Sequence, residues 1–91
     1  MKERLKTALI EGVGLDGKTA EKTVSAVAAW IDDEDRSNTK TIRTDSRLVV
    51  GKIEDDSLSL SITESTNVAG ASIVEPGAKS YIVKFPLETN S

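Results

Sequence analysis

Residues 5–31 read LKTALIEGVGLDGKTAEKTVSAVAAWI, and the rest of the chain is organised around this stretch. It contains two apolar patterns separated by Gly14-Leu15-Asp16-Gly17, a composition typical of a tight turn. In the second pattern the apolar residues recur at intervals of four, three and four positions, at Ala20, Val24, Val27 and Ile31. This spacing places them on one side of an α-helix. The stretch therefore predicts two short amphipathic helices joined by a turn.

The ends of both helices are also marked in the sequence. The apolar stripe of the first helix consists of Leu5, Leu9 and Val13. Gly12 or Gly14 can supply the left-handed residue that ends this helix. Asp16 is a suitable N-cap for the second helix, because its carboxylate can accept hydrogen bonds from the first turn. The acidic run Asp32–Asp35 is unfavourable at the negative end of a helix, so we expect the second helix to end there.

Strand patterns separated by turn residues follow the helices. The clearest is Ser57–Thr63, in which the apolar residues Leu58, Leu60 and Ile62 alternate with serine and threonine side chains. The other expected strands are Lys40–Arg43, Arg47–Ile53, Val68–Val74 and Lys79–Phe85, the last with Tyr81, Val83 and Phe85 on one face. Gly51 is a candidate β-bulge, and Pro76-Gly77 suits a type II turn.

These elements predict an α+β fold in a single domain, residues 1–91. A helical hairpin, residues 1–35, is followed by a roughly four-stranded antiparallel meander, residues 39–86, that packs on it. Residues 87–91 are expected to form a loose tail. Short connections favour antiparallel pairing of neighbouring strands, and one apolar sheet face needs a helical layer to cover it.

Composition limits the classes of protein that fit. The chain has 91 residues, no cysteine and a formal net charge of −3. The lack of cysteine excludes a disulfide framework and fits a reducing compartment, so a cytoplasmic protein is expected. No apolar stretch approaches the length needed to cross a membrane, and no membrane association is expected. From Ile53 to Ala78 there is acidic charge but no Lys or Arg, which would repel phosphates and lipid headgroups.

Catalytic and metal-binding patterns are absent from the sequence, so we expect no enzyme and no cofactor. Without histidine or cysteine the chain lacks the commonest general base, metal ligand and thiol nucleophile. It has no phosphate-binding loop and no dinucleotide fingerprint. Its acidic runs, Asp32–Asp35 and Glu54–Asp56, lack the spacing of a calcium-binding loop, and we interpret them as a solvated helix end and a solvated turn.

The run Val13–Ile31, VGLDGKTAEKTVSAVAAWI, resembles the start of the HU/IHF family of bacterial DNA-bending proteins. The residues that carry the resemblance are Leu5, Leu9, Gly14, Leu15, Ala20, Glu21, Lys22, Val27 and Ile31. The resemblance implies a related helical hairpin and, through it, DNA binding. The remainder departs from the family, because the region of the DNA-binding arms holds only acidic charge and no closing helix is apparent. No arm residue is carried over.

With no catalytic residues in view, the sequence favours a protein that binds another macromolecule. The first hypothesis is an acidic regulator or inhibitor that binds a protein, as some small phage inhibitors of nucleic-acid enzymes do. Its candidate interface combines apolar and acidic side chains: Trp30, Val49, Glu54, Asp55, Asp56 and Glu64. Trp30 lies beside the helical stripe, so it either closes the edge of the core or faces a partner.

Two alternatives remain open. An HU-like DNA-binding protein would use a small basic patch formed by Lys40, Arg43 and Arg47. No aromatic residues accompany these cations to stack on bases, which disfavours nucleic acid. The other alternative is a structural subunit of a larger assembly such as a virion, and a homodimer is compatible with either role.

Overall fold

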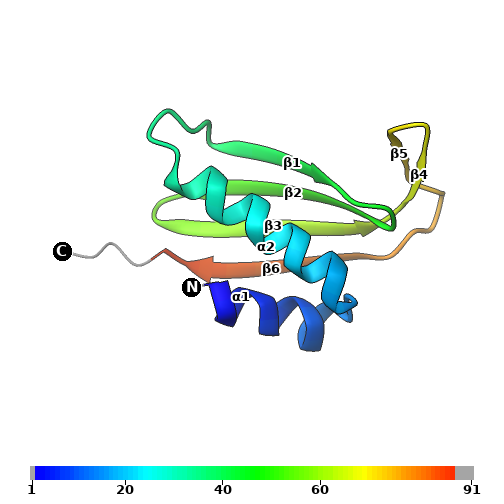
Figure 1. The fold of residues 1–91 in the computed structure, drawn as a ribbon, viewed down its shortest axis with the longest axis horizontal. Coiled ribbons are helices and arrows are strands. Elements are labelled where there is room, and N and C mark those ends of the chain that lie inside the picture. The colour runs from blue at the N-terminus through cyan, green and yellow to red at the C-terminus, as the bar shows by residue number, and fades with distance from the viewer. Residues whose placement is uncertain (1, 88–91) are drawn as a thin grey trace.

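The computed structural model of the chain describes residues 2–87, and within that range it has two helical segments and six strands. The helical elements are α1 (Lys2–Thr7) continued by η1 (Ala8–Val13), and then α2 (Gly17–Asp32). The strands are β1 (Thr39–Arg43), β2 (Arg47–Glu54), β3 (Ser57–Glu64), β4 (Thr66–Val68), β5 (Ala71–Ile73) and β6 (Ser80–Pro86). Four antiparallel strands form a sheet in the order β1-β2-β3-β6, with both helical segments on one side of it (Figure 1). The predicted α+β class is confirmed.

The first helical segment buries the expected stripe. Leu5 and Leu9 are fully buried and Val13 is nearly so. The segment widens into a π-helix over its second half and ends at Gly14, which has a φ of 85°. The N–H of Leu15 then donates to the carbonyl of Leu9 at 3.1 Å, which closes the turn and buries the Leu15 side chain. Of the two glycines that the sequence offered, Gly14 supplies the left-handed cap.

Helix α2 begins at the predicted N-cap. The carboxylate of Asp16 accepts hydrogen bonds from the hydroxyl of Thr19 at 2.6 Å and from its backbone N–H at 3.1 Å. These two bonds stabilise the charged form and lower the pKa of Asp16 from its usual value. The helix ends at Asp32, where the acidic run begins, as expected.

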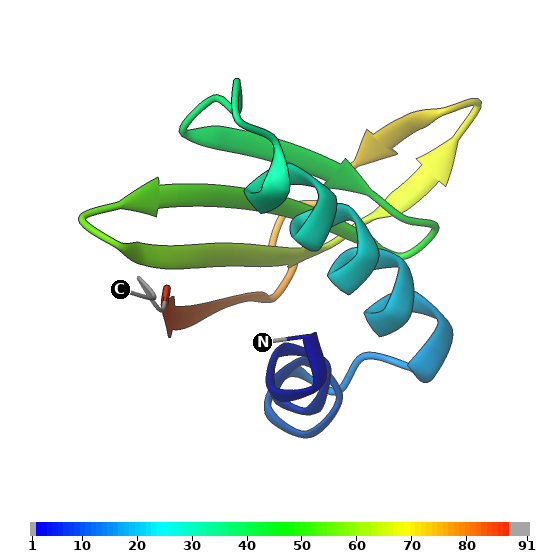
Figure 2. The ribbon, with the colours of Figure 1, turned by 60° about the vertical axis from the view of Figure 1, so that its left-hand side comes forward.

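The core lies between the helices and one face of the sheet. Register places Val49, Ile62 and Tyr81 in one row across β2, β3 and β6, and the side chains of Val49 and Ile62 are fully buried. Helix α2 crosses this face diagonally and the first helical segment lies beside β6 (Figure 2). The buried apolar side chains of this core are Leu5, Leu9, Val13, Leu15, Ala20, Val24, Val27, Trp30, Ile42, Val49, Leu58, Leu60 and Ile62.

Gly51 is not a bulge, contrary to the expectation from sequence. It pairs in regular register with Lys40 on β1 and with Leu60 on β3. A methyl group added at Gly51 would lie 2.8 Å from Cζ3 of Trp30. The glycine therefore provides room for the indole ring, and this close approach explains a glycine within the strand.

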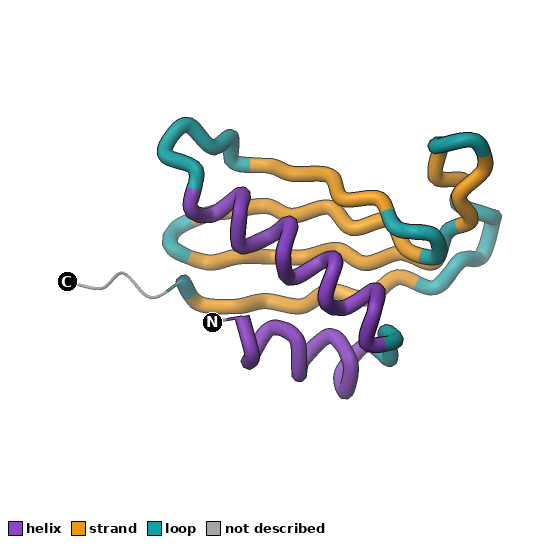
Figure 3. The backbone as a smooth tube through the Cα atoms, in the orientation of Figure 1, coloured by secondary structure: helices purple, strands orange, loops and turns teal. Residues whose placement is uncertain are grey.

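The expected strand Val68–Val74 is instead a hairpin, and this prediction was wrong. Strands β4 and β5 pair with each other in a separate two-stranded sheet, visible at one end of the molecule (Figure 3). Ala69 and Gly70 both have positive φ, at 53° and 84°, which reverses the chain in two residues. The side chain of Asn67 accepts the N–H of Gly70 at 3.0 Å and stabilises this reversal.

The last segment follows the sequence prediction more closely. Gly77 has a φ of 84°, and the N–H of Ala78 donates to the carbonyl of Glu75 at 3.1 Å, so the expected turn at Pro76-Gly77 is present. Leu87, assigned to the loose tail, packs against the core and donates its N–H to the carbonyl of Asp56 at 2.7 Å. Residues 88–91 of that tail lie outside the described residues.

Candidate binding surface

No helix or strand within residues 2–87 packs on the face of the four-stranded sheet that points away from the helices (Figure 2). We call it the open face. Burial alternates along β2, β3 and β6, and successive side chains of a strand point to opposite faces of the sheet. The neighbours of the buried core residues therefore belong to the open face. The side chains of the open face are those of Thr39, Thr41, Arg43, Leu48, Val50, Lys52, Glu54, Ser57, Ser59, Ser61, Thr63, Ser80, Ile82, Lys84 and Pro86.

Aliphatic side chains lie at the middle of the open face. Val50 and Ile82 stand in one row on either side of Ser61, and they are 41% and 68% exposed. Leu48, two residues before Val50 on the same face, is half-buried. Hydroxyl side chains surround this group on β1 and β3. An apolar centre with a polar margin is the composition typical of a protein-binding surface.

Cationic side chains lie on the same face. Lys52 and Lys84 occupy one row on either side of Ser59, and Arg43 lies at the end of β1. Among residues 2–87, the acidic side chain on the face is that of Glu54, which forms an exposed ion pair with Lys52 at 3.7 Å. The open face is thus positively charged although the whole chain carries a net charge of −3.

The two apolar residues proposed for the interface lie in the core, so neither is exposed to a partner; for Trp30 the structure bears out the alternative that it closes the core. Trp30 is 6% exposed, and its indole N–H donates to the carbonyl of Ser37 at 2.9 Å. Val49 is 0% exposed and lies under the helices, beside Ile42 and Ile62. The exposed residue is its neighbour Val50, because a shift of one position along a strand changes the face.

The acidic residues of the proposed interface do not form one surface. Glu54, Asp55 and Asp56 lie at the β2–β3 turn, whereas Glu64 lies at the far end of β3. The eight residues of β3 separate the two groups by about 25 Å. Asp55 and Asp56 have φ angles of 51° and 60°, a left-handed conformation that aspartate tolerates better than most residues. Their clearest role is to form the turn.

The candidate basic patch is also divided. Arg43 points to the open face. Lys40 and Arg47 lie at positions of β1 and β2 that face the same side as the buried residues Ile42 and Val49. The guanidinium of Arg47 is directed to the carbonyl of Ser46 at 3.0 Å. The two lysines that accompany Arg43, at positions 52 and 84, were missed by the sequence analysis. Their alternation with the buried residues of β2 and β6 is the signal that could have revealed them.

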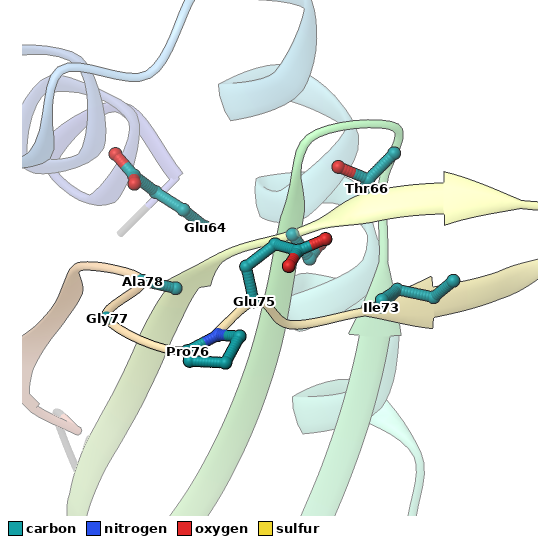
Figure 4. A pocket seen from close by; sticks show the side chains of 8 residues that line it. Glu64, Thr66, Ile73, Glu75, Pro76, Gly77 and Ala78 are labelled. Carbon is teal, nitrogen blue, oxygen red and sulfur yellow. The ribbon is translucent and has the colours of Figure 1, made fainter.

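A shallow hollow of about 300 Å³ lies between the β4–β5 hairpin and the turn at Pro76-Gly77. Glu64 and Glu75 both border it, but their carboxylates point in different directions (Figure 4). The backbone N–H of Lys79 lies 3.5 Å from the carboxylate of Glu64 and draws it to the sheet. The two acids therefore do not converge on one ligand.

No group of three His, Cys, Asp or Glu side chains within residues 2–87 is placed to hold a metal ion. In the same part of the chain, no helix combines the length and apolar character needed to cross a membrane.

Comparisons with known proteins identify no relative: no protein-family model, no curated protein and no solved structure matches this chain. The assignment of a function therefore depends on the surface described above.

Proposed function

We propose that this protein is a non-catalytic binding domain that contacts another protein through the open face of its sheet, in the role of a small regulator or inhibitor. The observation that carries the proposal is the exposure of Val50 and Ile82 at the middle of a sheet face that no described helix or strand covers. Apolar side chains in the centre of a contact surface supply much of the binding energy once water is excluded around them. The absence of cysteine fits a cytoplasmic location for this interaction.

The chemistry of the open face favours a partner with an acidic margin. Arg43, Lys52 and Lys84 surround the aliphatic centre, and only Lys52 has an acidic neighbour on the face. Complementary charge at the margin of an interface increases the rate and the specificity of association. The regulator or inhibitor role expected from the sequence is kept, but the proposed contact surface moves from the acidic turns to this cationic face.

Paired surface variants test the proposal. Val50→Thr combined with Ile82→Thr keeps β-branched side chains, and therefore strand preference. A hydroxyl replaces a methyl group at position 50 and the ethyl branch at position 82. The control is Val68→Thr on the β4–β5 hairpin, where the valine is 52% exposed. Proteins that each variant captures from cell extract are quantified by mass spectrometry. We expect one defined protein to be captured by the natural chain and by the control variant but not by the double variant. Equal capture by both variants would contradict the proposal.

The second candidate function is nucleic-acid binding, which the three cations of the open face favour. The described aromatic side chains, those of Trp30, Tyr81 and Phe85, all belong to the helix-covered side, so the open face offers no ring for base stacking. The β4–β5 hairpin, Thr66–Ile73, contains no Lys or Arg with which to act as an HU-like arm. Contact would have to be electrostatic, through the phosphate backbone.

Titration of a random-sequence duplex at increasing salt tests this second function. Electrostatic binding is expected to weaken steeply as salt rises, and Lys52→Gln combined with Lys84→Gln is expected to reduce the slope. Absence of binding at low salt would exclude this candidate and leave the protein-binding proposal.

A further inference from the structure

Strand β1 is the uncovered edge of the four-stranded sheet. In the order β1-β2-β3-β6, the opposite edge strand, β6, lies beside the first helical segment. The guanidinium of Arg4 lies 5.9 Å from the centre of the Phe85 ring, which joins that helix to β6. No helix or strand of the described chain lies along the outer side of residues 39–43 (Figure 1). Strand β4 approaches only beyond the end of β1, where the N–H of Asn67 donates to the carbonyl of Asp45 at 3.3 Å.

The hydrogen bonds of β1 to β2 determine which backbone groups point outward. The N–H of Thr44 donates to the carbonyl of Arg47 at 3.0 Å. The N–H of Ile53 donates to the carbonyl of Asn38 at 2.9 Å. Because hydrogen-bonded pairs alternate along an antiparallel ladder, Lys40 and Ile42 are bonded to β2 as well. The N–H and C=O groups of Thr39, Thr41 and Arg43 therefore point away from the sheet.

The backbone of this edge has no interruption that would keep it from pairing, although the strand carries two cations, Lys40 and Arg43. Residues 39–43 contain no proline, no positive φ and no bulge, and the register with β2 is regular throughout. The side chains of Thr39, Lys40, Thr41 and Arg43 are exposed. The outward backbone groups of Thr39, Thr41 and Arg43 are thus arranged as one side of a β-ladder.

We propose that β1 pairs antiparallel with β1 of a second copy of this chain, about a two-fold axis at Thr41, to form one continuous eight-stranded sheet. In this register Thr41 opposes Thr41 of the second copy, and Thr39 opposes Arg43. The outward backbone groups of these residues then meet one another, as the geometry of a hydrogen-bonded pair requires.

Charge complementarity supports a second copy as the occupant. Lys40 opposes Ile42 in this register, and Arg43 opposes Thr39, so no cation is opposite another cation. The antiparallel arrangement also brings the end of one β1, with Arg43, to the start of the other, which the exposed acids Asp33, Glu34 and Asp35 precede. A two-fold contact repeats this favourable arrangement at both ends. The pairing is made by the backbone edge of β1. Of the open-face side chains it brings Thr39, Thr41 and Arg43 to the seam, while Val50 and Ile82 stay outside it, so the proposal does not rest on the proposed function.

Cross-linking in the full chain tests the register, because the protein has no cysteine of its own. Across a hydrogen-bonded pair the Cα atoms lie about 5.5 Å apart, within the range of a disulfide. The Thr41→Cys variant is therefore expected to form a disulfide-linked dimer under mild oxidation, at least tenfold faster than Thr39→Cys. The two residues at position 39 would be about 13 Å apart in the proposed register, beyond that range.

Two measurements complete the test. Sedimentation at increasing concentration is expected to show a monomer–dimer equilibrium that Thr41→Pro abolishes, because proline removes an outward N–H while leaving the bonds to β2 intact. The exposed Lys52→Cys variant, on the neighbouring strand, measures random collision. Equal cross-linking rates for Thr41→Cys, Thr39→Cys and Lys52→Cys, or a monomer at every concentration, would overturn the proposal.

Discussion

The indole ring of Trp30 lies directly over Gly51, the residue in the middle of β2. A methyl group at position 51 would come within 2.8 Å of Cζ3 of Trp30 and 3.2 Å of Cδ2 of Leu60. The ring is held at its other end by the hydrogen bond from its N–H to the carbonyl of Ser37 at 2.9 Å. Helix α2, the loop after it and the centre of the sheet are therefore joined at one place in the core.

Gly51→Ala is expected to destabilise the protein by about 1–3 kcal/mol, because the added methyl group forces the ring, the leucine or the backbone to shift. Chemical denaturation followed by circular dichroism measures this change. The matched control is Gly12→Ala, where a methyl group meets no atom within 4 Å and the backbone has no positive φ. That variant is expected to be more stable by up to about 1 kcal/mol, since alanine favours helix. Destabilisation by both substitutions to the same extent would contradict this account.

Truncation of the adjacent residues Val49 and Val50 is expected to change stability by very different amounts. Val49→Ala removes fully buried methyl groups and is expected to cost about 2 kcal/mol of unfolding free energy. Val50→Ala acts on the open face and is expected to cost no more than about 1 kcal/mol, chiefly through the lower strand preference of alanine. Thermal and denaturant unfolding of the two variants measures the difference directly. Similar losses for both would show that the faces of β2 are assigned incorrectly.

Asp16 is expected to make stability depend on pH at the acidic end of the range. Its pKa is lowered in the folded state by the Thr19 hydroxyl and N–H, so its contribution is fully present above the unfolded value of 3.8. That contribution is lost as the pH falls through the folded pKa. Asp16→Asn keeps an N-cap but does not titrate. The difference in melting temperature between the natural protein and this variant is expected to shrink between pH 5 and pH 2, whereas a constant difference would contradict the assignment.

The fold class could be predicted because the decisive patterns are local and periodic. Ala20, Val24 and Val27 repeat at helical spacing, and Leu58 and Leu60 at strand spacing, so each element carries its own signal. The face of β2 could not be assigned from its own residues, because Leu48, Val49 and Val50 form a continuous apolar run without alternation.

The buried face of β2 can be assigned by counting residue pairs outward from the β2–β3 turn. If Asp55 and Asp56 form a two-residue turn, Glu54 pairs with Ser57, and each further step outward pairs the next two residues. Val49 then lies opposite Ile62, on the buried side. The open face and its valine follow from this count. The contact of Trp30 with Gly51 does not, because it depends on the path of α2 across the sheet.

The same turn gives the last prediction. Asp55 and Asp56 both have positive φ, a conformation in which glycine is unstrained and aspartate is only tolerated. Asp56→Gly is therefore expected to raise stability by up to about 1 kcal/mol. Asp45, in the turn between β1 and β2, has no positive φ. Asp45→Gly is expected to lower stability by about 0.5–1 kcal/mol, because glycine increases the conformational entropy of the unfolded chain and relieves no strain in the folded one. Equilibrium denaturation of both variants tests whether the sign of the effect follows the backbone conformation. A loss of stability in both would show that the acidic side chain of Asp56, and not its backbone, determines the turn.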